Sequence, residues 1–274
     1  MRKILIIGIG AGNPEHMTIQ AVNALNKADV LFIPDKGTEK AALQKLRTDI
    51  CERFITNKTH RFVDVKVPER ARVFSDYQSN VDEWHAQIEE NYENLLMKEI
   101  AEGECGAFLV WGDPMLYDST LRIIERIHLK GFAFEYEVIP GISSIQVLAA
   151  RHRIPLNRIG EPVLITTGRK LANGFPEGVD SVVVLLDGDQ TFNRFAADNL
   201  YIHWGAYLGT DKEILVSGNL AEVMHDIEAI RERARKENGW IMDTYLLRKP
   251  DVADIDEMEE GAAHRTADTS GLTK

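Results

Sequence analysis

The sequence predicts an α/β protein that is divided into two domains. Short aliphatic runs that fit buried strands alternate with longer segments in which apolar residues recur every three or four positions, as in amphipathic helices. Glycine-containing loops follow several of the aliphatic runs. The length of 274 residues favours two modest domains, although one large α/β domain would also accommodate it.

The N-terminal half favours a parallel sheet. Residues 3–9 form an aliphatic run that leads into glycines, Thr18 then caps an amphipathic helix, and residues 30–33 form the next aliphatic run. A strand, a glycine loop, a helix and a second strand in this order are typical of parallel sheets, whose neighbouring strands need a crossover connection. Helices are also expected over residues 36–52, 81–102 and 143–152, and strands over residues 107–110 and 134–139.

The C-terminal half is richer in strands, which are expected over residues 163–166, 181–186, 201–206 and 241–247, with a helix over residues 221–236. We place the domain boundary after residue 118, which gives an N-terminal α/β domain of residues 1–118 and a C-terminal α/β domain of residues 119–250. Residues 251–274 are acidic, small and polar with almost no large apolar side chains, and are predicted to be a disordered tail.

Charge and composition exclude several functions. The formal net charge of -11 argues against nucleic acid as the main partner, because phosphate contacts need a basic face. The longest aliphatic stretches fall far short of the roughly 20 residues of a membrane span. Cys51 and Cys105 have no Cys or His neighbour at metal-ligand spacing, so neither a disulfide framework nor a metal site is expected. The N-terminus lacks an apolar signal core, and a cytoplasmic protein is expected.

The first chemical motif is the glycine loop of residues 8–14, which directly follows a strand. Glycines allow tight turning and close approach of the backbone to a ligand. A dinucleotide fingerprint needs glycine at its sixth position, where this chain has Asn13, and Pro14 interrupts direct passage into a helix. An NAD(P)-dependent oxidoreductase is therefore the less favoured interpretation.

Two further motifs follow predicted strands. Residues 109–117 run from a strand into a Gly-Asp-Pro turn, and residues 138–144 run from a strand into Pro-Gly-Ile-Ser-Ser. Gly, Asp and Pro are common in ordinary turns, and Ser143 or Ser144 could simply cap a helix. Each motif alone is therefore weak evidence for a ligand site.

Together, in this order and spacing, the three motifs resemble the tetrapyrrole methylase family, over roughly residues 3–248. Ala11 stands where many relatives have proline. The resemblance implies a parallel-sheet αβα N-terminal domain, a mixed-sheet C-terminal domain and a ligand cleft between them. It also implies a homodimer that uses S-adenosylmethionine as methyl donor. The donor-binding residues that it implies are Ala11, Trp111, Gly112, Asp113, Leu116, Ser143, Ser144, Leu186 and Gly209.

In the segments that flank these motifs, the chain is most similar to the deacylating branch of the family, which acts in cobalamin biosynthesis. That branch implies methylation of precorrin-5 at ring carbon C-1 and loss of the extruded acetyl group as acetate. A methyltransferase acting at another ring position or substrate, and a donor-binding module without turnover, stay open as alternatives. The segments that carry this likeness are residues 33–37, 60–62, 68–72, 84–85 and 204–207.

Loss of acetate requires water to add to a carbonyl, which calls for a positioned base and an oxyanion stabiliser. The candidates are Asp118, His85 and Tyr117, although Asp118 could cap a helix and the other two could be packed or surface residues. Basic side chains could hold the substrate carboxylates or could be solvated surface charges. These are Lys58, Arg61, Lys66, Arg70, Arg72, Arg151, Arg153 and Arg158.

Overall fold

A computed structural model describes residues 1–35, 41–56, 59–66 and 77–250, and it confirms an α/β fold with two sheets. The chain forms two units. Of the described residues, the first unit contains those of Met1–Val147 and Leu208–Asp211, and the second contains those of Leu148–Tyr207 and those from Lys212 to residue 250. The predicted tail, residues 251–274, lies outside the described residues.

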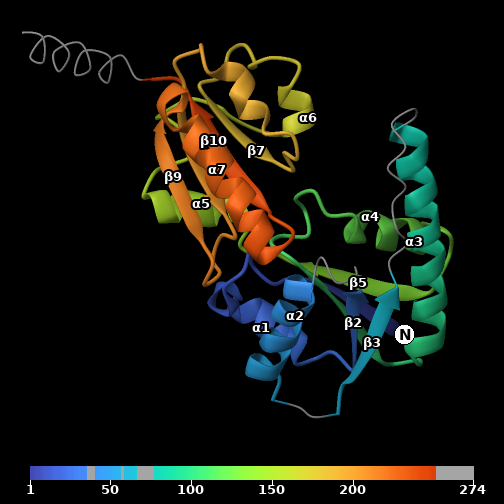
Figure 1. Cartoon of the computed structure of the whole chain (residues 1–274). Helices are drawn as coiled ribbons and strands as arrows, with labels where there is room; N and C mark the ends of the chain where they lie inside the picture. The colour runs from blue at the N-terminus through green and yellow to red at the C-terminus, as the bar shows by residue number, and fades with distance from the viewer. Residues whose placement is uncertain (36–40, 57–58, 67–76, 251–274) are drawn as a thin grey trace, which may run out of the picture. The chain divides into compact units, whose positions relative to one another are not determined.

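The first unit is built on a five-stranded, fully parallel sheet, as predicted (Figure 1). Its strand order is β3-β2-β4-β1-β5, so that β1 lies between β4 and β5. The order differs from the chain order because each parallel connection crosses over through a helix. The strands are β1 (Arg2–Gly8), β2 (Val30–Asp35), β3 (Arg61–Lys66), β4 (Cys105–Val110) and β5 (Phe134–Ile139).

Both faces of this sheet are covered by helices, which explains the unbroken aliphatic sequence of β1. Successive side chains of a strand point to opposite faces. Leu5 and Ile7 pack with α1 (Ile19–Leu25) and α2 (Ala41–Phe54), whereas Ile4 and Ile6 pack with α3 (Tyr77–Glu99) and α4 (Thr120–Leu129). Thr18 caps α1 as predicted, since its hydroxyl accepts a hydrogen bond from the Ala21 amide at 3.0 Å.

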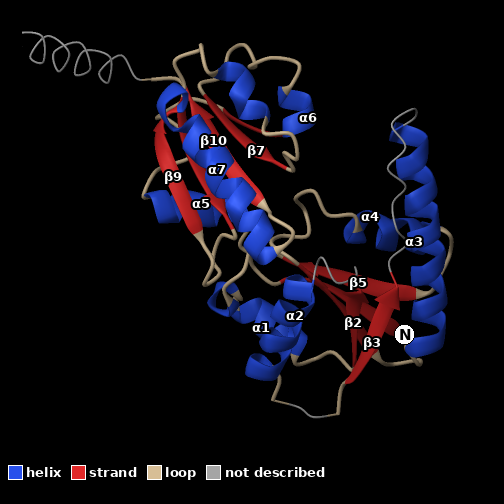
Figure 2. Ribbon diagram, in the orientation of Figure 1, coloured by secondary structure: helices blue, strands red, loops and turns tan. Residues whose placement is uncertain are grey.

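The second unit contains a second sheet (Figure 2), which is mixed and has the strand order β6-β7-β10-β8-β9. The β6 and β7 strands are parallel, and the other pairs are antiparallel. One face is packed by the long helix α7 (Leu220–Asn238) and by the short helices α6 (Gly168–Leu171) and η3 (Thr191–Phe195). The strands are β6 (Val163–Thr167), β7 (Ser181–Leu185), β8 (Tyr201–Ala206), β9 (Ile214–Asn219) and β10 (Asp243–Arg248), and α5 (Ser144–His152) leads into this unit.

Hydrophobic periodicity misses two strands, β3 and β9, and both lie at the edge of a sheet. β3 carries Arg61, Asp64 and Lys66 among its apolar residues, and β9 has only three consecutive apolar residues, so the aliphatic signal of each strand is weak. The sequence places the domain boundary after residue 118. However, α4 and β5 follow that position and belong to the first unit, because β5 pairs with β1 along its whole length.

Among the described residues, no helix combines the length and the apolarity needed to span a bilayer. The two cysteines are free: Cys51 is buried and Cys105 is partly buried. Burial raises the pKa of the Cys51 thiol to about 12 and that of Cys105 to about 11. Both thiols therefore stay protonated at neutral pH and are poor nucleophiles.

Candidate functional site

The three motifs of the sequence meet at one edge of the first unit. They follow β1, β4 and β5, which are neighbours in the sheet and run parallel, so that their carboxyl ends lie together. In open α/β sheets, ligands bind outside the carboxyl ends of the strands. The topology therefore brings three motifs that are far apart in the sequence together at one candidate site.

The glycine loop of residues 8–14, which we call the first loop, is hydrogen-bonded to the Gly-Asp-Pro loop of residues 109–117. The Gly112 amide donates to the Gly10 carbonyl at 2.8 Å, and the Gly10 amide donates back at 3.3 Å. The indole Nε1 of Trp111 donates to the Ala11 carbonyl at 2.7 Å. Ala11 and Trp111 are thus held side by side by a contact that the sequence motifs alone do not reveal.

Asp113 joins the Gly-Asp-Pro loop to the loop of residues 138–144, which we call the third loop. Its Oδ2 accepts a hydrogen bond from the Gly141 amide at 2.8 Å, and its Oδ1 accepts one from the Met115 amide at 2.8 Å. Leu116 continues this turn, with its amide donating to the Asp113 carbonyl at 3.2 Å. Because each carboxylate oxygen already bonds to the backbone, Asp113 organises the loops.

The glycines at this edge are required by close approach of the backbones. A Cβ atom on Gly141 would lie 2.1 Å from the Gly112 carbonyl oxygen, and a Cβ atom on Gly8 would lie 2.6 Å from the Gly141 nitrogen. Gly112 differs, because its φ of +73° demands glycine while its nearest non-neighbouring atom would be the Cα of Ser143 at 3.8 Å. A Cβ atom at Gly112 would therefore make only an ordinary van der Waals contact, although the residue is buried.

Ser143 forms a capping box with Gln146 at the start of α5. The Ser143 hydroxyl accepts a hydrogen bond from the Ile145 amide at 3.2 Å, and the Ser143 amide donates to Oε1 of Gln146 at 3.0 Å. This reciprocal pairing is a common helix start. Ser143 and Ser144 are both buried. The helix-capping interpretation of Ser143 is therefore supported, and contact of either serine with the donor stays a prediction.

Gly209 lies against the first loop, because the segment Leu208–Asp211 belongs to the first unit. A Cβ atom on Gly209, which has a φ of +79°, would lie 2.8 Å from Cε1 of His16, and one on Gly12 would lie 2.6 Å from the Leu208 carbonyl. The fold thereby brings Gly209 close to the loop that contains Ala11. Leu186 lies in the second unit, in the turn directly after β7.

The three predicted catalytic residues have different surroundings. Asp118 directly precedes Ser119, the N-cap residue of α4, and its Oδ1 accepts a hydrogen bond from the Thr120 amide at 2.7 Å. Tyr117 is 43% exposed with a φ of +54°, and partial burial raises the pKa of its phenol. His85 lies within α3, but its side chain falls outside the described residues. Asp118 and Tyr117 thus lie next to the loop cluster.

Several of the predicted carboxylate-binding cations are engaged elsewhere in the protein. Arg61 pairs with Glu104 at 2.8 Å, Arg151 pairs with Glu213, and Arg158 pairs with Asp180 at 3.3 Å. Arg153 ends the turn after α5 with a φ of +58°. The side chains of Lys58, Lys66, Arg70 and Arg72 lie outside the described residues.

Arg47 is a buried cation near the site that sequence reasoning missed. Its Nε donates to the Leu109 carbonyl at 2.9 Å. Leu109 directly follows Phe108, the last residue of β4 that pairs with β2. Burial lowers the pKa of the guanidinium, and the charge of Asp118 opposes this effect. One arginine in an amphipathic helix gives no signal in the sequence, because only the fold shows that it is buried.

A histidine pair in the second unit should make stability depend on pH. The rings of His203 and His152 lie 5.1 Å apart, and burial, His152 and Arg248 lower the pKa of His203 to about 4. The neutral ring is therefore favoured in the folded state. Its contribution to stability is present above the unfolded pKa of about 6.5 and is lost as the pH falls towards 4.

We expect the free energy of unfolding to fall between pH 6.5 and 5 by on the order of 1 kcal/mol, after discounting for the partial exposure of the ring. Urea titrations at several pH values would measure this. The variant His203→Gln should show a shallower dependence over the same range. Equal slopes for both proteins would exclude His203 as the cause.

Comparisons with known proteins agree with this geometry. A family model described as Tetrapyrrole (Corrin/Porphyrin) Methylases matches residues 3–224. A Sinorhizobium sp protein named Precorrin-6A synthase [deacetylating] is 59% identical over 94% of this chain and 98% of its own length. The crystal structure of a putative cobalamin synthesis related protein from Corynebacterium diphtheriae is 38% identical, with a TM-score of 0.79 over 92% of this chain and all of that one.

A more distant structure, uroporphyrin-III C-methyl transferase from Thermus thermophilus complexed with S-adenyl homocysteine, is 19% identical with a TM-score of 0.52. It covers 90% of this chain and 97% of its own, and it supports the fold alone. The family model covers most of the chain, and the Sinorhizobium relative is matched along almost its entire length. The chain therefore belongs to the tetrapyrrole (corrin/porphyrin) methylase family.

Proposed function

We propose that this protein is an S-adenosylmethionine-dependent C-methyltransferase of cobalamin biosynthesis that methylates precorrin-5 at C-1 and releases acetate, giving precorrin-6A. The observation that carries the proposal is the meeting of three glycine loops at the carboxyl edge of a parallel sheet. The end-to-end similarity to the Sinorhizobium precorrin-6A synthase supports this particular reaction. The less specific alternative is methylation of another tetrapyrrole.

The donor would be recognised chiefly through backbone groups. The side chains of Asp113 and Ser143 are already engaged in hydrogen bonds with the protein, and Gly112 and Gly209 have no side chain. Ala11, Trp111, Leu116 and Ser144 would add further contacts from the first unit. Recognition by backbone groups explains why the motifs specify the path of the chain through glycine and proline.

The methyl group of the donor would pass directly to carbon. A new carbon–carbon bond forms as the carbon–sulfur bond breaks, and the electron pair stays on sulfur in S-adenosylhomocysteine. This displacement needs alignment of the two reactants, which can lower the barrier by roughly 7–11 kcal/mol. The hydrogen-bonded loops are suited to this task because they hold one geometry.

Release of acetate is a second step with different needs. Water adds to the acetyl carbonyl, the bond between that carbon and the ring breaks, and the acetyl carbon leaves as acetate. Asp118 is the candidate base, because its carboxylate is fixed by the Thr120 amide next to the Gly-Asp-Pro loop. Tyr117 is the candidate donor to the developing oxyanion, since its partly exposed phenol adjoins the same loop.

Calorimetric titration with S-adenosylhomocysteine would test the proposal first, with NAD and NADP as parallel controls. We expect micromolar binding of S-adenosylhomocysteine alone. Incubation with the donor and precorrin-5 should then yield a methylated product and one equivalent of acetate. Binding of a nicotinamide cofactor instead would overturn the class, whereas methylation without acetate would favour the alternative substrate.

We also infer that the protein is a homodimer, as the family resemblance implies, and that it acts in the cytoplasm. The net charge of -11 is consistent with a small-molecule substrate and argues against a nucleic acid partner. Sedimentation equilibrium would test the oligomeric state, since a dimer has twice the mass of the 30.9 kDa chain.

A further inference from the structure

Arg47 of α2 carries its charge into the interior of the first unit, where the residue is only 5% exposed. Its Nε donates to the Leu109 carbonyl at 2.9 Å, and its Nη1 donates to the Leu43 carbonyl at 3.2 Å. The pairing of β4 with β2 ends at Phe108, whereas β2 pairs with β3 as far as Asp35. The guanidinium therefore lies at the carboxyl end of β4, where this strand no longer pairs with β2.

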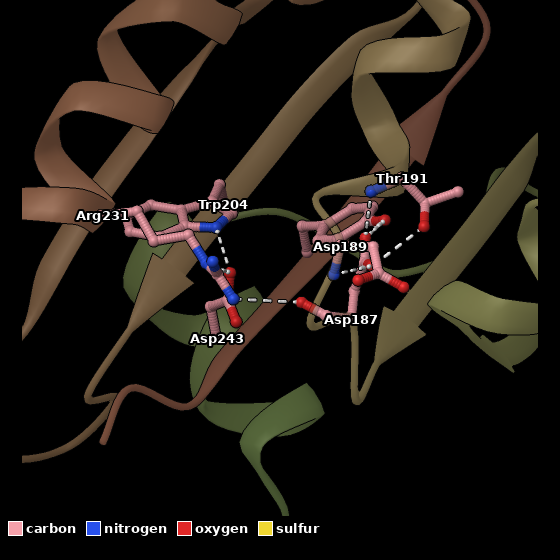
Figure 3. Close-up of polar contacts among 7 residues, drawn as sticks. Asp187, Asp189, Thr191, Trp204, Arg231 and Asp243 are labelled. Carbon is pink, nitrogen blue, oxygen red and sulfur yellow. Dashed lines mark hydrogen bonds and ion pairs between the residues drawn. The ribbon is translucent and has the colours of Figure 1, made fainter. Parts of the chain in front are cut away.

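The other buried arginine of the protein, Arg231, has a different environment. Its Nε lies 3.0 Å from Oδ2 of Asp243, and its Nη2 donates to the Asp187 carbonyl at 3.1 Å (Figure 3). Such a contact pair is the usual arrangement, because burial penalises a charge that has no countercharge. Arg47 bonds to two carbonyl groups, and within the described ranges of the chain it forms no ion pair. Its charge therefore needs another explanation.

The carboxylate that acts on Arg47 is that of Asp118. Burial lowers the pKa of the guanidinium, and the negative charge of Asp118 opposes this effect. Asp118 is partly buried, and its Oδ1 accepts a hydrogen bond from the Thr120 amide at 2.7 Å. The side chain of Thr120 is hydrogen-bonded to the phenol of Tyr92, whose pKa is raised by burial. Tyr92 therefore stays neutral, and Arg47 and Asp118 carry the charges of this cluster.

We propose that Arg47 is a positioning residue for the release of acetate, whose buried positive charge orients and stabilises the carboxylate of Asp118 beside the Gly-Asp-Pro loop. This inference rests on the proposed function, in which Asp118 is the base of that step. A buried guanidinium stays protonated and is screened little by salt, so its attraction for the carboxylate persists under all working conditions.

The step that Arg47 would assist is the hydrolysis of the acetyl group. The water oxygen bonds to the acetyl carbon while one water proton passes to Asp118. The bond between that carbon and the ring then breaks, and its electron pair neutralises the positive charge that the ring gained with the methyl group. Both water protons are released, one through Asp118 and one from acetic acid. Methyl transfer itself uses no base, so the two steps should respond differently to loss of Arg47.

The variant Arg47→Gln removes the charge and keeps an amide that can donate to the Leu109 carbonyl. We expect acetate release to slow about tenfold, because an opposite charge near the base is lost. The rate of methyl transfer and the Kd for S-adenosylhomocysteine should stay within about twofold of wild type, since alignment of the donor does not need this charge. Single-turnover reactions with precorrin-5 would measure both rates, and a methylated product that retains the acetyl group should accumulate.

Two further variants test whether Arg47 acts through Asp118. Arg47→Lys keeps a positive charge without the forked geometry, so acetate release should recover to within about threefold of wild type. Asp118→Asn should slow acetate release about a hundredfold through loss of the base. Adding Arg47→Gln to Asp118→Asn should slow it little further, because residues that act as one unit are not additive.

Lys45→Gln is the matched control on the same helix. Its side chain is 75% exposed and pairs with Asp49 at 2.6 Å. Exposed pairs of this kind contribute little, so both rates and the Kd should stay within about twofold of wild type. Thermal unfolding of each variant would establish that it is folded.

A purely structural role for Arg47 would slow methyl transfer and acetate release equally in Arg47→Gln and would weaken donor binding. That result, or additive losses in the double variant, would overturn the positioning role. If Arg47→Gln does not fold, a parallel loss of both rates in Arg47→Lys would overturn it as well. Failure of the proposed function is a separate result, in which the wild-type protein releases no acetate from precorrin-5.

Discussion

Replacement of Gly112 by leucine is expected to abolish measurable binding of S-adenosylhomocysteine while the protein stays folded. The glycine has a φ of +73°, and a Cβ atom there would meet nothing closer than 3.8 Å. At the backbone, the folding cost is the strain of a left-handed residue, about 1–2 kcal/mol. The loss of binding follows because a leucine side chain would fill the space at the strand ends where the donor is proposed to lie.

A matched glycine controls for that strain. Gly178 has a φ of +72°, is exposed, and has no atom within 4 Å of its hypothetical Cβ atom. Gly178→Leu should therefore carry the same backbone strain and keep wild-type donor affinity. Titration calorimetry and urea unfolding of both variants would measure the two effects. Unchanged affinity in Gly112→Leu would place the donor elsewhere.

Replacement of Arg231 by methionine is expected to destabilise the protein by about 3–5 kcal/mol. Arg231 and Asp243 form a buried ion pair at 3.0 Å, with side-chain exposures of 9% and 5%. Loss of the cation leaves a carboxylate without a countercharge in the interior, where burial already raises the pKa of Asp243. The midpoint of urea unfolding would report the effect.

The pH dependence of this loss of stability, together with control variants, would identify its cause. Without Arg231, the pKa of Asp243 should rise further above its unfolded value, so the deficit should shrink as the pH falls and the carboxyl group becomes neutral. Arg231→Met with Asp243→Asn should recover part of the loss, since the amide oxygen can still accept from Trp204. Lys236→Met, which breaks an exposed pair with Glu232, should cost at most about 1 kcal/mol. A deficit that does not depend on pH would contradict the ion-pair explanation.

Local sequence patterns predict the sheet of the first unit and the residues at its edge. The aliphatic run of β1, the Thr18 cap and the glycine loops are each specified within a few residues, because periodicity, capping and φ preference are local properties. The resemblance to tetrapyrrole methylases also depends on such local motifs in a fixed order. It was enough to predict the family and the two-sheet fold, both of which are confirmed.

Tertiary structure alone decided how these pieces fit together. Only the strand order β4-β1-β5 brings Gly141 against Gly112 and lets Asp113 bond to the third loop. The edge strands β3 and β9 were missed because β3 mixes charged and apolar residues and β9 has only three consecutive apolar residues, and their pairing is visible only in the folded sheet.

Two arginines that resemble ordinary surface charges in the sequence are buried in the fold. Arg47 bonds to Leu109, 62 residues away, and Arg231 bonds to the Asp187 carbonyl, 44 residues away. The family resemblance places Leu186 in the donor site, but only the fold shows its left-handed backbone. The sequence by itself determined which loops bear the chemistry, through local conformational preferences. Their assembly, and the buried charges that hold it, depend on contacts between distant residues that only the folded chain creates.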